Sequence, residues 1–448
     1  MKKAISIILA ICMVAVLAAA CAADAPPPPP PPATPPAADA APAEQPPATG
    51  DAPAQQPPAA GDTPAAAADP PPGETIEAPF PGRIAIVTNT LDQNEEEFRS
   101  AEALVDRYGP ERVIHATWPV MFAAEGEMMI TILSNLASIP DVGAIIINQA
   151  VVNTVAAIDA ARAINPDLFI VVASAAEDPG DVSSRVDLAL DVNNPQIGTY
   201  FVGQAVEMGA EAIVHISFPR HMAVPSLAVR RDRMAAAAEA AGIPFHEVDS
   251  LDPMGEGGMA AAQLYIAQNV ERWVEEFGVN TVFFSTNCGQ QVPLLQQILA
   301  TGAMYVQPCC PSPFHAFPTA FGLPSHIGTG VFGPDGRELT RMVDVTEIID
   351  LTSQAVRAAG LEGRLANWMV PASFVWTTVG FYYAAAWLSG EFVQAPGDPP
   401  NMELINRLVG DYLERIFGNR FYMQLGNLEI GDDVFPMYVL GIVPYLVY

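Results

Sequence analysis

Three cysteines and one histidine lie close together in the second half of the sequence. They are Cys288, the adjacent pair Cys309 and Cys310, and His315. Thiolate sulfur and imidazole nitrogen are zinc ligands, but the spacing here is not a zinc pattern. Outside the cytoplasm, two such cysteines more often oxidise to a disulfide. We rank a disulfide or buried thiols first, a contact with a bound ligand or cofactor second and a metal site third, and we do not expect the adjacent pair to bridge itself.

Polar side chains follow several apolar runs of strand length. In open parallel α/β sheets, ligands bind at the carboxyl ends of the strands, so these positions are candidates for a binding site. The predicted ligand-binding residues are Asn89, Gln149, Phe218, Arg220, His221 and Asn287. Ser174, Asp191, Asn193 and Asn194 occupy similar positions. Helix caps and turns explain Ser174 and the two asparagines equally well.

Arg220 is the strongest of these candidates. Its guanidinium keeps its charge and can offer paired donors to a carboxylate or phosphate, while Phe218 supplies a flat apolar wall. The alternative is that Arg220 and His221 only tie this connection to the first half of the fold. A substitution of Arg220 would then lower the stability of the protein and leave its affinity for ligand unchanged.

Composition and motifs exclude several enzyme classes. Lys2 and Lys3 are the only lysines, so a chain that has lost its first residues has no Walker A lysine, Schiff-base lysine or serine–lysine dyad. No Gly-x-Ser-x-Gly or His-Glu-x-x-His motif occurs. We therefore assign no catalytic residue, metal or cofactor and predict a non-enzyme. An enzyme that uses the cysteine and histidine group stays as an alternative.

Two other patterns are interpreted as ordinary structure. Residues 328–333 match the dinucleotide fingerprint, but Pro-Asp-Gly follows where a helix should begin, which indicates a turn. Glu95, Glu96 and Glu97 resemble paired carboxylates, but a solvated helix face explains them more simply. The net charge of −30 at pH 7 repels phosphate backbones, so we expect no nucleic-acid partner.

The predicted fold that positions these residues is α/β, because apolar runs of strand length alternate with helical patterns from residue 82 onward. The expected strands are 84–88, 113–116, 143–148, 168–173, 186–192, 212–217, 245–249, 281–285 and 304–307. The expected helices are 95–108, 128–137, 151–164, 196–209, 228–241, 259–277, 290–301, 340–358, 372–389 and 401–417. Residues 437–448 also have a strand pattern. We expect parallel sheets in two lobes: 82–192 forms the first, 193–330 the second, and 331–448 completes both with helices and a C-terminal strand.

The start of the chain predicts export. Residues 1–21 have two lysines, an apolar stretch and small residues before Cys21, which is a signal-peptide pattern. They resemble the bacterial lipobox, although Leu17 lies four residues before the cysteine where three is usual. We predict that Cys21 carries lipid. Residues 22–81 are mostly alanine and proline, which predicts a disordered linker.

Two resemblances support this reading. A lipid-anchored chain with two successive parallel α/β lobes resembles the type I periplasmic solute-binding proteins, including the basic-membrane-protein and nucleoside-receptor lipoproteins. The segments 217–222, 230–232, 283–288 and 307–315 resemble the bacterial family named domain of unknown function 3798. The first resemblance implies a ligand cleft between the lobes, and the second implies the same fold without naming an activity.

We therefore predict a lipid-anchored protein on the extracytoplasmic side of the cell membrane. It captures a small polar solute by closure of an interlobe cleft and passes it to a membrane transporter. A ligand-sensing module for a membrane receptor is the main alternative.

Overall fold

The computed structural model describes residues 80–332, 338–418 and 423–448. The expected signal sequence, Cys21 and nearly all of the expected linker lie outside these ranges. Within them, no helix is long and apolar enough to cross a membrane. Phe80, which we had assigned to the linker, is 2% exposed and packs against the rings of Tyr108 and Phe381. The packed region therefore includes residues before position 82.

The first lobe is built on a seven-stranded sheet with the order β12-β13-β5-β4-β3-β1-β2. Its strands are β1 (Arg83–Thr88), β2 (Val113–Thr117), β3 (Val142–Asn148), β4 (Phe169–Ala173), β5 (Leu188–Val192), β12 (Gln424–Ile430) and β13 (Asp433–Ile442). Every neighbouring pair is parallel except β12 and β13. Strands β1, β3, β4 and β5 are buried along nearly their whole length, as apolar strands covered on both faces should be.

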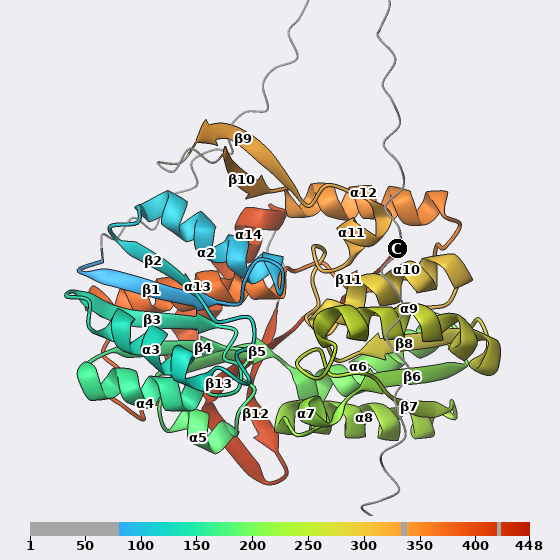
Figure 1. Ribbon diagram of the computed structural model, residues 1–448, viewed down its shortest axis with the longest axis horizontal. Helices are drawn as coiled ribbons and strands as arrows, with labels where there is room; N and C mark the ends of the chain where they lie inside the picture. Colours follow the sequence, from blue (N-terminus) through green and yellow to red (C-terminus); the bar gives the residue numbers. More distant parts are fainter. Residues whose placement is uncertain (1–79, 333–337, 419–422) are drawn as a thin grey trace, which may run out of the picture. The chain divides into compact units, whose positions relative to one another are not determined.

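Helices cover both faces of this sheet (Figure 1). One layer contains α2 (Glu95–Tyr108), α13 (Ala372–Leu388) and α14 (Met402–Phe417), and the other contains α3 (Gly126–Ala137), α4 (Thr154–Ile164) and α5 (Pro179–Ser183). Alternate side chains of β1 enter different cores: Ile84 and Ile86 pack with the α13 layer, and Ala85 and Val87 with the α3 layer. Helix α13 has no charged residue and is buried on nearly every side, because α2, α14 and the sheet surround it.

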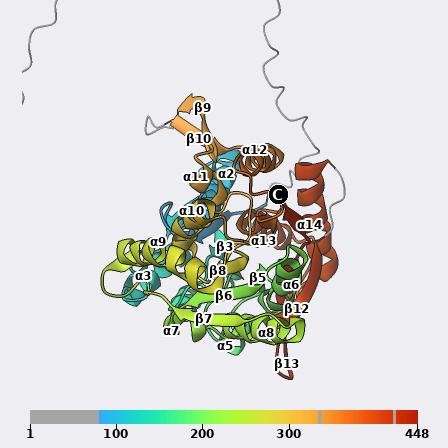
Figure 2. The ribbon, with the colours of Figure 1, turned by 90° about the vertical axis from the view of Figure 1, so that its right-hand side faces the viewer.

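The second lobe contains a three-stranded parallel sheet with the order β7-β6-β8 (Figure 2). Its strands are β6 (Ala212–Ser217), β7 (Phe245–Asp249) and β8 (Thr281–Ser285). Its helices are α6 (Asn194–Glu207), α7 (Pro219–Met222), α8 (Pro225–Ala241), α9 (Gly258–Phe277), α10 (Gln291–Thr301), α11 (Phe317–Phe321) and α12 (Val345–Ala358). The strand expected at 304–307 is reduced to single bridges at Met304 and Tyr305.

The last part of the chain returns to both lobes. Strand β11 (Ala366–Trp368) pairs with β14 (Tyr445–Val447), whereas β12 and β13 join the first sheet. The sequence patterns predicted neither β11, which lies between α12 and α13, nor β12, which follows α14. The expected α/β fold with two lobes is confirmed.

A β-hairpin occupies the segment where a turn and the start of a helix were expected. Strand β9 (His326–Phe332) pairs antiparallel with β10 (Glu338–Met342), so the glycine-rich motif from residue 328 runs along a strand instead of a turn. The Pro-Asp-Gly that follows lies outside the described residues. The helix expected at 340–358 begins at Val345, because the Asp344 carboxylate accepts a hydrogen bond from the Thr346 amide and caps it.

Candidate functional site

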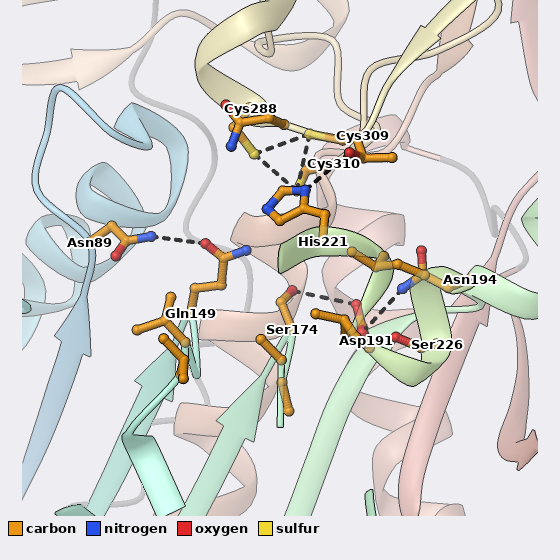
Figure 3. A pocket seen from close by; sticks show the side chains of 18 of the residues that line it. Asn89, Gln149, Ser174, Asp191, Asn194, His221, Ser226, Cys288, Cys309 and Cys310 are labelled. Carbon is orange, nitrogen blue, oxygen red and sulfur yellow. Dashed lines mark hydrogen bonds between the residues drawn. The ribbon is translucent and has the colours of Figure 1, made fainter. Parts of the chain in front are cut away.

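A cavity of about 310 Å³ lies between the two lobes. Its wall includes the residues that directly follow β1, β3, β4 and β8, and Arg220 and His221 shortly after β6, which is where parallel strands present groups to ligands. The volume suits a small molecule. Figure 3 shows that polar side chains of the first lobe face the loops of the second across this space.

Asn89 and Gln149 form one part of the first-lobe wall. The Asn89 amide nitrogen Nδ2 donates to Oε1 of Gln149 at 2.8 Å (Figure 3). The Asn89 backbone N–H donates to the buried Glu97 carboxylate at 2.7 Å, which holds this residue in place. Within the described residues, Oδ1 of Asn89 is buried and has no hydrogen-bond partner. An unsatisfied buried acceptor beside a cavity is a position for a ligand donor.

Asp191 forms the deepest acidic part of the wall. Its carboxylate accepts from the Val192 amide at 2.7 Å, from Asn194 Nδ2 at 3.3 Å and from Ser174 Oγ at 3.4 Å (Figure 3). Burial raises the pKa of Asp191 to about 7, although these hydrogen bonds act in the opposite direction. Ser174 has a φ of 52°, which is strained for a residue other than glycine and indicates a site constrained by its surroundings.

Arg230 supplies a buried positive charge that the sequence reading did not assign to the site. It lies on α8, is 1% exposed, and donates from Nη1 to Asn194 Oδ1 at 2.6 Å. Its guanidinium lies 4.7 Å from the centre of the Phe284 ring. Among the described residues, neither Nε nor Nη2 has a hydrogen-bond partner. Burial lowers the pKa of Arg230, and a guanidinium still keeps its charge at neutral pH.

Arg220 lines the cavity, and two of its donor nitrogens pair with Asp252. Nε and Nη2 donate to the two carboxylate oxygens of Asp252 at 2.8 and 2.7 Å. Burial opposes the Asp252 charge, yet the hydrogen bonds from Arg220 and the Met254 amide outweigh it and lower the Asp252 pKa. Asp252 therefore already pairs with two nitrogens of Arg220, and the role of Arg220 as a ligand-binding residue stays a prediction.

Phe218 and His221 form the adjoining part of the second lobe. Phe218 is 1% exposed and is not part of the cavity wall, so the flat apolar surface predicted for it is covered. Its ring packs against His221, with centroids 4.2 Å apart. His221 does line the cavity, and its Nδ1 lies 3.0 Å from the Thr286 hydroxyl. Burial, together with the charges of Arg220 and Arg230, lowers the His221 pKa to about 3, so the ring is neutral at pH 7.

The three cysteines meet at the second-lobe side of the cavity. The sulfur of Cys288 lies 3.1 Å from that of Cys309 and 3.5 Å from that of Cys310, and the last two are 3.9 Å apart. All three line the cavity as free thiols (Figure 3). Burial opposes ionisation of Cys309, but hydrogen bonds from the other two thiols and the charge of Arg230 lower its pKa well below the usual value. His315 lies behind them and is not in the cavity wall.

Two acids of α2 were interpreted wrongly as a solvated face. Glu96 and Glu97 are 6% and 1% exposed. Burial raises the pKa of Glu96 to about 7 and that of Glu97 well above its usual value. Glu96 accepts from the Phe374 amide at 3.1 Å, and Glu97 from Asn89. Both acids therefore support the cavity wall from behind.

Most of the predicted positions converge on the cavity. Those that line it are Asn89, Gln149, Arg220, His221, Asn287, Cys288, Cys309 and Cys310. Phe218 and His315 do not. Sequence reasoning missed Arg230, although its position in the sequence offered a signal. Arg230 lies at intervals of four from Ser226, Met234 and Ala238, and these four residues form the buried face of α8. A charged residue on a buried face needs a partner. Trp376 of α13 also reaches the wall, and its buried Nε1 has no partner among the described residues.

The comparisons with known proteins agree with this architecture. An uncharacterized protein of Treponema pallidum (strain Nichols) is 29% identical over 172 residues, which cover 38% of this chain and 79% of that protein. A protein described as a transcriptional regulator from Clostridium difficile 630 has the same fold, with a TM-score of 0.61 and 19% identity over 82% of this chain and 99% of that one. A solute-binding protein of an ABC transporter from Agrobacterium vitis, solved with D-fucose, is more distant, with a TM-score of 0.45 and 14% identity over 70% of this chain and 91% of that one.

The family model for Protein of unknown function (DUF3798) matches residues 83–366, which is more than half of the chain and spans the cavity-forming strands. The chain belongs to this family.

Proposed function

We propose that this chain is an extracytoplasmic, lipid-anchored solute-binding protein that closes its two lobes around a small polar solute. One observation carries the proposal: polar atoms that are buried and have no hydrogen-bond partner in the described part of the chain border a cavity at the strand ends. They are Asn89 Oδ1, Arg230 Nε and Nη2, and Trp376 Nε1. Leaving such groups unpaired costs about 1–3 kcal/mol each, and a bound solute removes that cost.

The polar and aromatic side chains that line the cavity limit the type of solute that it can bind. Arg230 supplies two free donors and a positive charge, so one end of the solute should carry a carboxylate, a phosphate or several acceptor oxygens. Asp191 and Asn89 provide acceptors for a hydroxyl or amine of the solute. Phe122 and Trp376 add aromatic surface to the same wall. A small molecule that carries both acceptor and donor groups fits these residues better than an apolar one.

The test is to release and identify the solute. The mature protein is purified gently, denatured, and its supernatant analysed by mass spectrometry. If nothing is recovered, sugars, nucleosides, amino acids and carboxylates are screened by thermal shift, because a ligand at about 100 times its Kd stabilises by about 2.7 kcal/mol. The proposal expects a solute whose binding is weakened by Arg230→Met. Failure of every class to bind or to raise the melting temperature would contradict it.

The mode of attachment and the partner are part of the same proposal. Residues 1–21 and Cys21 support a lipid anchor, and the Ala/Pro-rich segment that follows supports a tether between that anchor and the lobes. Closure of two lobes around a solute suits delivery to a membrane transporter, and it suits a receptor equally. Co-purification of the protein from membranes, with its membrane partner identified, separates these two uses.

A further inference from the structure

The sulfur cluster has the dimensions of a metal-binding site. Sulfur atoms that share a tetrahedral zinc ion lie about 3.8 Å apart, given zinc–sulfur bonds of about 2.3 Å. The three sulfur separations here are 3.1, 3.5 and 3.9 Å. One ligand atom from each of Cys288, Cys309 and His315 lies within 4.8 Å of the other two. Small side-chain movements therefore bring these three atoms around one ion.

His315 is oriented as a metal ligand usually is. Its Nδ1 lies 2.8 Å from the backbone carbonyl oxygen of Cys310. A carbonyl only accepts, so Nδ1 carries the hydrogen, and Nε2 of the neutral ring keeps its lone pair. Histidines that bind metal commonly donate their other ring nitrogen to a carbonyl in this manner. The remaining contact of Nε2, 3.4 Å from the Cys288 carbonyl oxygen, is too long to compete strongly for it.

We propose that Cys288, Cys309 and His315 form a binding site for a thiophilic divalent metal ion of the zinc class at the second-lobe wall of the cavity. Thiolate and imidazole ligands select zinc and similar ions over magnesium or calcium. Cys310 lies beside the site, and its sulfur is within reach of a fourth coordination position. The site does not depend on which solute the cavity binds.

A disulfide between Cys288 and Cys309 is the competing arrangement, since these two sulfur atoms are the closest pair. It would use both sulfur ligands and leave Cys310 as the single thiol of the cluster. Metal binding requires the thiols of Cys288 and Cys309 to be reduced and protects these two from alkylation, so the metal-bound protein keeps all three thiols of the cluster. The two arrangements therefore give different thiol counts and different metal contents.

The test measures metal directly on the mature, full-length protein. The protein is reduced, stripped with a chelator and titrated with Co²⁺ and then Zn²⁺, while thiolate-to-cobalt charge-transfer absorption and native mass are recorded. We expect one ion per chain, a charge-transfer band that Zn²⁺ abolishes, and protection of the thiols from alkylation. Cys309→Ser and His315→Ala should each weaken binding at least about 100-fold, as loss of a ligand exceeds the 10–100-fold loss seen for outer partners.

His246→Ala is the matched control, because His246 stacks on Phe277 in the second lobe and does not belong to the cluster. It should bind cobalt as the unmodified protein does. Melting temperatures of the metal-free variants show that each is folded. Absence of the charge-transfer band in the fully reduced protein, or equal binding by Cys309→Ser, overturns the metal site. Either result leaves solute binding, which is measured separately with Arg230→Met, unaffected.

Discussion

Arg230 Nη1 and Asn194 Oδ1 form a hydrogen bond of 2.6 Å that joins helices α8 and α6 in the cavity wall. The same Asn194 donates from Nδ2 to Asp191 at 3.3 Å, so one amide connects the buried cation to the buried acid. The stacking of the Arg230 guanidinium on Phe284 limits its rotation further. A positive group held in place in this way, with two donors unused, is arranged to recognise a ligand.

Replacing Arg230 tests that arrangement. Arg230→Met should reduce affinity for the solute recovered from the protein by about 2–5 kcal/mol, because the solute group facing it is left buried and unpaired. Folding stability should change less, since the substitution removes two unsatisfied donors along with one hydrogen bond. Calorimetry and melting on the same sample measure both. Arg231→Met is the control, because Arg231 pairs with Glu247 and Asp232 outside the cavity. Equal affinities for the two variants would remove Arg230 from the site.

Arg220 should behave differently. Its bidentate pair with Asp252 holds the loop after β7, and about a third of each side chain is exposed. We expect Arg220→Ala and Asp252→Ala to destabilise the protein by similar amounts, with a coupling of about 0.5–1 kcal/mol in a double-mutant cycle. Chemical denaturation of the two single variants and the double variant gives this value. Additive effects would show that the pair does not contribute, and a large loss of affinity with unchanged stability would restore Arg220 as a ligand contact.

The sequence was sufficient to locate the cavity. Apolar runs buried on both faces mark parallel strands, and parallel strands present their carboxyl ends on one edge of a sheet. Asn89, Gln149, His221 and Asn287 could be chosen on that basis alone, and all four line the cavity. The same reasoning failed for Phe218, because successive residues of an extended segment point in opposite directions and its register is set by the whole sheet.

The sequence did not predict which distant segments contact one another. Arg220 finds Asp252 only because the loops after β6 and β7 are neighbours in the folded sheet. Glu96 and Glu97 look solvated on the helix α2 alone, and become buried because α13, almost 280 residues later, packs against that helix. The sequence likewise did not show that the last strands join the sheet of the first lobe, because a C-terminal strand carries no local signal for the sheet that it enters.

Lipidation of Cys21 should account for membrane attachment. Cys21→Ala should release the protein from membranes into the soluble fraction, because the lipid on this one residue would supply the whole attachment. Cell fractionation and mass spectrometry of the N-terminus measure this. A variant with an intact Cys21 but with residues 24–78 shortened serves as the control and should stay attached. Tight membrane association of Cys21→Ala after signal removal would contradict the prediction.

Buried acids and buried histidines give opposite dependences of stability on pH. The pKa of His115 is lowered to about 4 and those of His215 and His221 to about 3, in each case mainly by burial. These groups bind fewer protons when folded, so they destabilise the protein as the pH falls below about 6.5. The raised pKa values of Asp191 and Glu96 have the reverse effect. Because these effects oppose each other in the whole protein, the difference in stability between the unmodified protein and a single variant is more informative than the pH profile of the protein alone.

Asp191→Asn isolates one of these effects in the ligand-free protein. Burial raises the Asp191 pKa from 3.8 to about 7, so between these values the folded state holds a proton that the unfolded state has lost. Stability from this group is therefore lost as the pH rises through that window, by up to about 1.4 kcal/mol per pH unit, and changes little above about pH 7. The free energy of unfolding of Asp191→Asn relative to the unmodified protein should thus increase with pH from about 4 to about 7 and then level off. Urea denaturation at several pH values measures the difference, and Asp167→Asn, on an exposed turn, should show no such trend. A difference that falls with pH would mean that Asp191 is ionised and stabilised by Arg230 in the folded protein.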